Sequence, residues 1–126
     1  SVERFKPFLD GLDEEHLRRF RAPTAKPTTW LVPNNGSATL WISGGRDTLA
    51  LRITEHPVAA ALCTAIGGPL VSTSANPQGL PAAKSALEVE SYFGDAVDML
   101  APGQIGSSAN PSEIRHLMSG EIVRAG

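Results

Sequence analysis

The fold class follows most directly from residues Asp47–Val71, DTLALRITEHPVAAALCTAIGGPLV, which predict a strand, a helix and a second strand in succession. Apolar and polar residues alternate over Asp47–Thr54, as in a strand with one buried face. Pro57 opens the following apolar stretch and Gly67 closes it; these residue types favour the first turn and the end of a helix. The second strand is expected at Pro69–Val71. Strands that alternate with helices predict an α/β protein.

The remainder of the chain extends this alternation. The further expected elements are a short helix interrupted or ended near Pro7, helices at Asp13–Phe20 and from about Lys84 to Phe93, strands at Thr28–Val32 and Val97–Leu100, and two β segments around the Ser119–Gly120 turn. The 126 residues show no convincing repeat or internal boundary. We therefore expect a single domain at residues 1–126, built on a twisted, mixed or mainly parallel sheet with flanking helices.

The composition is that of a globular protein without a strong net charge. Apolar residues make up 41% and charged residues 19%, and the net charge is −2, which argues against a dedicated nucleic-acid binder. Cys63 is the single cysteine, so an intrachain disulfide is excluded and the thiol is expected to be buried as a small apolar group. No apolar stretch reaches the length of a membrane span and Ser1 begins no signal peptide, so we expect a cytoplasmic protein.

The polar face of the strand at Asp47–Thr54 carries the first candidate binding residues. Thr48 and Arg52 lie on the same side of the strand, about 13 Å apart at about 3.3 Å per residue, with the small Ala50 between them. An arginine above a small residue suits bidentate capture of a carboxylate or phosphate. The alternative is an edge strand whose arginine pairs with a surface acid, and the residues alone leave both possibilities open.

Ser72–Asn76, STSAN, follows an expected strand and is broken by Pro77 shortly afterwards. Hydroxyls and backbone N–H groups at a strand end suit an anionic ligand, although a plain turn fits the same residues equally well. The loop has neither the P-loop pattern nor the nucleophile-elbow pattern, so no covalent nucleophile is expected. The histidines have no metal-like spacing and no zinc motif accompanies them; His56 is expected to be a capping or surface residue.

Three segments together resemble the YrdC/TsaC family of threonylcarbamoyl-AMP synthases. They are TLALRITEHPVAAALC (48–63), GPLVSTSANPQGLPA (68–82) and NPSEIRHLMSGEIVRAG (110–126), in this order and spacing. The resemblance implies an α/β sheet with a large concave ligand cavity. It also implies an enzyme that converts L-threonine, ATP and bicarbonate or CO₂ into threonylcarbamoyl-AMP and pyrophosphate, with Mg²⁺ required. Partner proteins would then transfer the threonylcarbamoyl group to an adenosine of tRNA.

Carried over residue by residue, the resemblance implies two sets of binding residues. Arg52, Ser72 and Ser112 would contact threonine, whereas Thr48, Ser74, the Ala82 backbone and Arg124 would contact the nucleotide. Asn76 and Pro77 would shape the loop that holds the serines. Without the resemblance, Arg124 would be interpreted instead as part of a salt bridge near the carboxyl terminus. These roles agree with a reaction that depends on positioning and charge neutralisation.

The chain departs from the family pattern in two places. Family members carry a Pro-Thr-Glu segment and a Lys-x-Arg motif before the matched region, whereas none of Lys6, Lys26 and Lys84 is followed two residues later by arginine. The chain is therefore expected to correspond to the C-terminal two thirds of such a domain, and by itself would lack part of the site. Before the strand at Thr28–Val32, the family's Pro-Gly-Pro is replaced by Ala25-Lys26-Pro27.

Two other functions were compared with this one. A non-catalytic RNA-binding or ribosome-associated module of the same fold is favoured by the missing Lys-x-Arg motif and disfavoured by the acidic net charge. Salt-dependent, sub-micromolar binding to structured RNA without nucleotide binding would support it. For the synthase itself, at most weak RNA binding is expected. A carbamoyl-adenylate domain of a hydrogenase-maturation carbamoyltransferase is disfavoured by the single cysteine, because that protein carries zinc-finger cysteines.

Overall fold

The computed structural model describes residues 2–106 and 111–126, and its centre is a four-stranded mixed sheet. The strands are β1 (Thr28–Pro33), β2 (Thr48–Leu51), β3 (Glu113–His116) and β4 (Ile122–Arg124), in the order β2-β1-β3-β4. β1 pairs antiparallel with β2 and parallel with β3, and β3 pairs antiparallel with β4. The expected α/β class and mixed sheet are confirmed, and so are the two β segments around the Ser119–Gly120 turn.

Five α-helices and two short 3₁₀ helices accompany the sheet in the described residues. They are α1 (Lys6–Leu9), α2 (Glu14–Arg21), α3 (Leu40–Ser43), α4 (Pro57–Ile66) and α5 (Ala86–Phe93), with 3₁₀ turns at Val2–Phe5 and Gly94–Ala96. Pro7 lies in the first turn of α1 rather than ending a helix, because its missing N–H is not needed there. Gly67 ends α4 in the left-handed conformation, as the sequence predicts.

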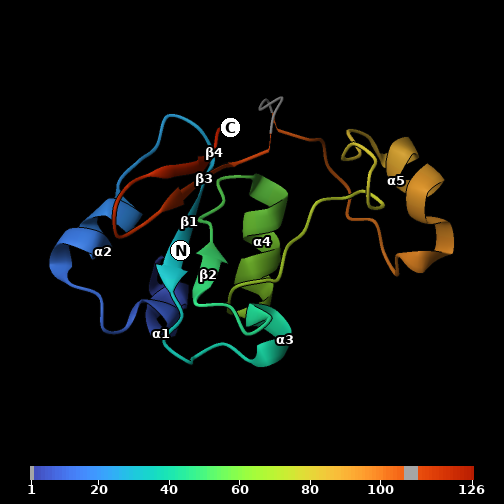
Figure 1. Ribbon diagram of the computed structural model, residues 1–126. Helices are drawn as coiled ribbons and strands as arrows, with labels where there is room; N and C mark the ends of the chain where they lie inside the picture. Colours follow the sequence, from blue (N-terminus) through green and yellow to red (C-terminus); the bar gives the residue numbers. More distant parts are fainter. Residues whose placement is uncertain (1, 107–110) are drawn as a thin grey trace.

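The core lies on one face of the sheet, beneath α1 and α2 (Figure 1). The buried apolar residues are Leu9, Phe20, Trp30, Val32, Leu49, Leu51 and Leu117. The alternation predicted for the second strand is present, because Leu49 and Leu51 are buried while Ala50 between them is exposed. β2 ends at Leu51, and the next residue, Arg52, is exposed.

The opposite side of the molecule is open. Neither α4 nor α5 contains a buried residue, and Figure 1 shows α5 away from the sheet, joined to α4 by an extended segment. The accessible surface is 9067 Å², whereas the usual scaling with mass gives about 6,500 Å² for a compact protein of this size. The large apolar residues that remain exposed on this side include Leu62, Ile66, Leu70, Val71, Leu87 and Ile105. This side therefore contributes little to the core.

Two strand predictions are wrong. Pro69–Val71 and Val97–Leu100 form no strand, and both stretches are exposed. Each is short, Pro69 lacks an N–H group, and neither pairs with a strand in the described part of the chain. The predicted burial of Cys63 is also wrong: the residue is half-buried, because it lines a small cavity of about 120 Å³ beside Phe5 and Ile53.

We predict that the N-cap of α2 contributes measurably to stability. Asp13 accepts a hydrogen bond from the backbone N–H of His16 at 3.1 Å, and the imidazole of His16 lies 2.7 Å from the same oxygen. Replacing Asp13 with alanine should lower the free energy of unfolding in urea by about 1 kcal/mol. Asp13→Asn keeps the cap and should restore most of that loss. An alanine variant as stable as the unmodified protein would contradict the assignment.

Candidate functional site

Arg52 follows β2, which is an edge strand of the sheet. The sequence left open that the strand lies at the edge of the sheet and that its arginine forms an ion pair with a surface acid. No such ion pair to Arg52 occurs within residues 2–106 and 111–126. Arg52 instead lines two cavities, one of about 640 Å³ and a smaller one of about 120 Å³. The arginine is therefore available to a ligand that enters the larger cavity.

The larger cavity combines apolar walls with several cations. Its lining includes the aromatic rings of Phe20 and Trp30, the basic side chains of Arg21, Lys26 and Arg52, and the single acidic side chain of Glu55. Its volume lies in the range of small-molecule sites, which are mainly apolar with a few polar groups that orient the ligand. Arg21 lies 3.9 Å from a Glu14 carboxylate oxygen and Lys26 lies 3.4 Å from one of Glu113, whereas Arg52 has no ion pair among the described residues. Arg52 beside apolar walls therefore favours an anionic ligand with an apolar portion.

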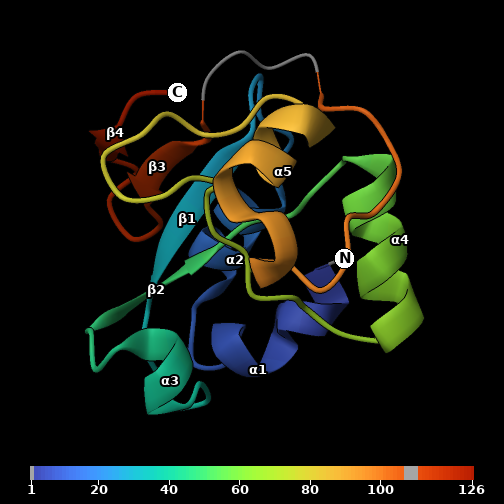
Figure 2. The ribbon, with the colours of Figure 1, turned by 90° about the vertical axis from the view of Figure 1, so that its right-hand side faces the viewer.

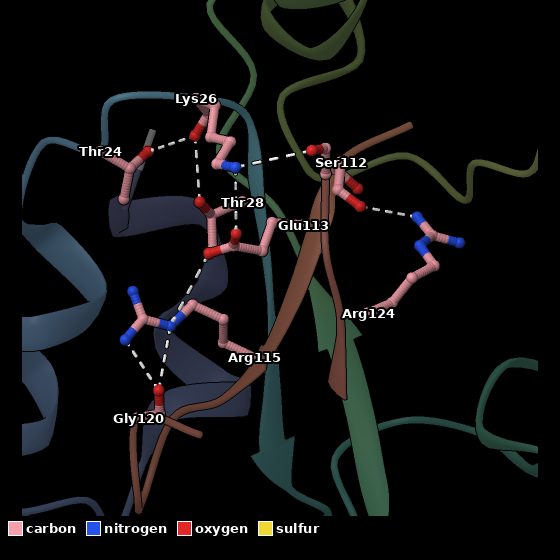
Figure 3. A network of polar contacts seen from close by, with 9 residues as sticks. Thr24, Lys26, Thr28, Ser112, Glu113, Arg115, Gly120 and Arg124 are labelled. Carbon is pink, nitrogen blue, oxygen red and sulfur yellow. Dashed lines mark hydrogen bonds and ion pairs between the residues drawn. The ribbon is translucent and has the colours of Figure 1, made fainter. Parts of the chain in front are cut away.

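Ser112 and Arg124 meet at the beginning of β3. Arg124 Nη2 donates a 2.7 Å hydrogen bond to the Ser112 carbonyl (Figure 3). The Ser112 hydroxyl lies 2.7 Å from that of Thr29 on β1. The register explains the meeting, since Arg124 pairs with Ile114 and Thr29 pairs with the same residue from the other side. The sheet thus brings together one residue predicted to bind threonine and one predicted to bind the nucleotide.

A buried carboxylate lies directly beside this pair. Glu113 is 6% exposed, with Lys26 Nζ 3.4 Å from one carboxylate oxygen and Arg115 Nε 3.9 Å from the other (Figure 3). Arg115 also lies over the Trp30 ring, 5.3 Å from its centroid. A buried carboxylate requires such cationic partners. The group anchors the start of β3, and hence Ser112, to the loop before β1.

The Ser72–Asn76 loop is held by its own hydrogen bonds. The Asn76 amide donates to the carbonyls of Leu80 at 2.8 Å and Pro77 at 3.2 Å, and the Ala83 N–H donates to the Ala75 carbonyl at 2.8 Å. Ser72 and Ser74 themselves are exposed. In Figures 1 and 2 this loop lies beside α5. The Asn76 contacts fix the shape of the loop without placing it against the sheet.

The structure therefore brings only some of the predicted site residues close to one another. Arg52 lies in the cavity and Ser112 contacts Arg124, whereas Thr48 lies at the other end of β2, paired with Pro33. The cavity lining does not include Ser72, Ser74 or Ala82. The binding roles of all these residues stay predictions, as does one concave cavity that holds both ligands. Asn110 of the Asn-Pro-Ser motif lies outside the described residues.

Lys26 and His56 line the cavity beside Arg52, although sequence reasoning gave neither a binding role. In the sequence, Lys26 stood out only as a departure from the family's Pro-Gly-Pro, where it replaces the glycine. His56 was expected to cap a helix, and it is the N-cap of α4. Among the described residues, no cluster of three or more His, Cys, Asp or Glu side chains could hold a metal ion, and no helix is long and apolar enough to span a bilayer.

The mixed sheet and the cavity lined by cationic side chains define an α/β protein with a site suited to a small anionic ligand. Comparisons with known proteins identify its family. The model of the Sua5/YciO/YrdC family, described as telomere recombination, matches residues 1–126. The chain belongs to this family.

Curated relatives agree with this assignment. The threonylcarbamoyl-AMP synthases of Cellvibrio japonicus and Stutzerimonas stutzeri are 49% and 50% identical to the chain over 124 residues, which are 98% of the chain and 66% of each relative. That of Pseudomonas entomophila is 44% identical over 126 residues, which are 100% of the chain and 68% of the relative. The chain thus spans about two thirds of the length of the curated relatives it matches.

Proposed function

We propose that the protein carrying this chain forms threonylcarbamoyl-AMP from L-threonine, ATP and bicarbonate or CO₂, with release of pyrophosphate. The proposal is supported by relatives at 43–50% identity that bear the name threonylcarbamoyl-AMP synthase. The observation that carries it within this chain is Arg52 in a cavity with two further cations and two aromatic rings. Such a cavity suits an amino acid carboxylate and a nucleotide, both of which combine anionic and less polar parts.

In this proposal, the residues act by binding and charge neutralisation. Arg52 would hold the threonine carboxylate, with Ser72 and Ser112 as further threonine contacts. Threonine's amino group and bicarbonate or CO₂ supply a carbamate, and a carbamate oxygen attacks the α-phosphate of ATP while pyrophosphate leaves. Cations and N–H dipoles stabilise the charge that develops on the phosphoryl oxygens, so no covalent protein nucleophile is needed.

The nucleotide contacts proposed for this chain are Thr48, Ser74, the Ala82 backbone and Arg124. Mg²⁺ would accompany ATP. The ATP phosphates and water would supply oxygen ligands to it. The threonylcarbamoyl group would then pass to tRNA with the help of partner proteins.

The direct test is pyrophosphate release that depends on both threonine and bicarbonate. It should be measured on the 126-residue chain and on a chain extended at its amino terminus by the segment with the Pro-Thr-Glu and Lys-x-Arg motifs that the family resemblance leads us to expect. We expect activity in the extended protein, because the extension supplies further contacts to both ligands. An extended protein that folds but releases no threonine-dependent pyrophosphate would refute the proposed function.

A further inference from the structure

The segment Ala101–Gly106 returns to the amino-terminal end of α4 and is bound there by His56. The His56 Nε2 atom lies 2.7 Å from the carbonyl oxygen of Gln104, which is 48 residues further along the chain. The other ring nitrogen, Nδ1, accepts from the backbone N–H of Ala59 at 3.5 Å, as expected of an N-cap. One imidazole therefore links the start of a helix to a distant segment.

The orientation of the ring is determined by its partners. A carbonyl oxygen only accepts and a backbone N–H only donates, so the two contacts require the proton on Nε2 and the lone pair on Nδ1. The backbone of His56 is fixed as well, because its N–H donates to the Thr54 hydroxyl at 3.1 Å. The imidazole is thus a rigid connection between α4 and Gln104.

A glycine at position 103 allows the segment to approach α4 closely. Gly103 has a φ of 141°, and a Cβ at this position would lie 2.8 Å from Val58 Cγ2. A Cβ at Gly106 would lie 4.0 Å from the His56 ring. The segment is therefore seated on the first turn of α4 at more than one point. We call the His56–Gln104 hydrogen bond, together with the Gly103–Val58 approach, the α4 clasp.

The α4 clasp forms part of the cavity that contains Arg52. His56, Ala59 and Gly106 line this cavity together with Arg52, although they come from segments far apart in sequence. We propose that His56 is a positioning residue: through Gln104 it holds the segment 103–106, whose last residue, Gly106, lines the Arg52 cavity. The nature of the ligand, threonine, rests on the proposed function, whereas the clasp itself does not.

Two substitutions at His56 separate its contacts. Asparagine is a good N-cap and keeps an acceptor for the Ala59 N–H, but its short side chain does not reach Gln104. Glutamine places an amide donor near the position of Nε2, but its acceptor is poorly placed to cap the helix. His56→Asn should therefore release the segment while keeping α4 capped, and His56→Gln should do the reverse.

The first readout is backbone motion measured by ¹⁵N relaxation on the full chain. In the unmodified protein the order parameters of residues 103–106 should be about 0.85, and in His56→Asn they should fall below about 0.6. His56→Gln should stay near the unmodified value while its thermal midpoint falls. Order parameters in His56→Asn equal to those of the unmodified protein would overturn the proposal.

The second readout is kinetic and tests the link to the ligand. In the amino-terminally extended protein, His56→Asn should raise the KM for threonine by about tenfold, because the cavity wall is displaced. His56→Gln should restore the KM. A normal KM in His56→Asn despite a released segment would overturn the role in the cavity. If the extended unmodified protein had no threonine-dependent activity, the proposed function would be contradicted instead. The α4 clasp would then be tested by the relaxation measurement alone.

Glycine substitutions provide an independent variant with a matched control. Gly103→Ala should release residues 103–106 in the same way, because its methyl group would clash with Val58. Gly79→Ala is the control: Gly79 also has a positive φ, 88°, but a Cβ there would meet nothing within 4 Å. Equal order parameters at residues 103–106 in these two variants would contradict the close approach.

Discussion

Replacing Arg52 with alanine should raise the KM for threonine more than any other single change outside the core. The guanidinium is free of ion pairs among the described residues and lines the 640 Å³ cavity. Loss of a charge-assisted bidentate contact to a carboxylate should cost about 2–4 kcal/mol. At about 1.4 kcal/mol per tenfold change, this corresponds to about 30- to 700-fold in KM. Steady-state pyrophosphate release at varied threonine concentration in the extended protein measures it.

Two variants make the Arg52 result specific. Arg52→Lys keeps the charge but loses the planar pair of donors, so its KM should lie between those of the unmodified protein and the alanine variant. Arg46→Ala removes an equal charge from an exposed position before β2 that does not line the cavity, and it should leave the KM unchanged. An unchanged threonine KM in Arg52→Ala would remove Arg52 from the threonine site.

Replacing Phe20 with alanine should produce the largest loss of stability. The side chain is 2% exposed and its ring packs edge-on against Phe5, with 5.9 Å between the ring centroids. Removing a buried aromatic ring typically costs about 3–5 kcal/mol, because burial is lost and a cavity remains. Phe20 also joins α2 to the sheet beside Trp30. Urea denaturation followed by circular dichroism should show a midpoint far below that of the unmodified protein.

Trp41→Ala is the matched control for Phe20. Trp41 is also aromatic, but it is 96% exposed in α3. Its replacement should change the free energy of unfolding by less than about 0.5 kcal/mol, as for most surface positions. If the two variants were destabilised equally, the core would not lie between α1, α2 and the sheet as the structure places it.

Local patterns predicted the elements whose ends are set by a few neighbouring residues. α4 begins at Pro57 and ends before Gly67 as expected, because proline suits a first turn and glycine adopts the left-handed cap. The alternation around Leu49 and Leu51 likewise predicted which face of β2 is buried. The predicted strand was too long, since pairing with β1 ends at Leu51. Arg52 therefore lies just beyond the strand, where it lines the cavity.

Local sequence patterns did not predict correctly those elements that form only by pairing with a distant segment. The apolar stretches Pro69–Val71 and Val97–Leu100 resemble strands, but a strand forms only when another strand satisfies its N–H and C=O groups. Neither finds one among the described residues. The same limit applies to Cys63. Its apolar neighbours in sequence predicted burial, whereas in the fold it lines a small cavity beside Phe5 and is only half-buried.

The α/β class, the helix at Pro57–Ile66, the paired β segments near the carboxyl end and the candidate binding residues could all be inferred from the amino-acid sequence. Which of the candidate residues contact one another became clear from the folded chain. Ser112 reaches Thr29 across 83 residues and His56 reaches Gln104 across 48, whereas the serines of the Ser72–Asn76 loop lie outside the Arg52 cavity. The physical reason is that caps and alternation depend on neighbours along the chain, while a site depends on sheet register and packing between distant segments.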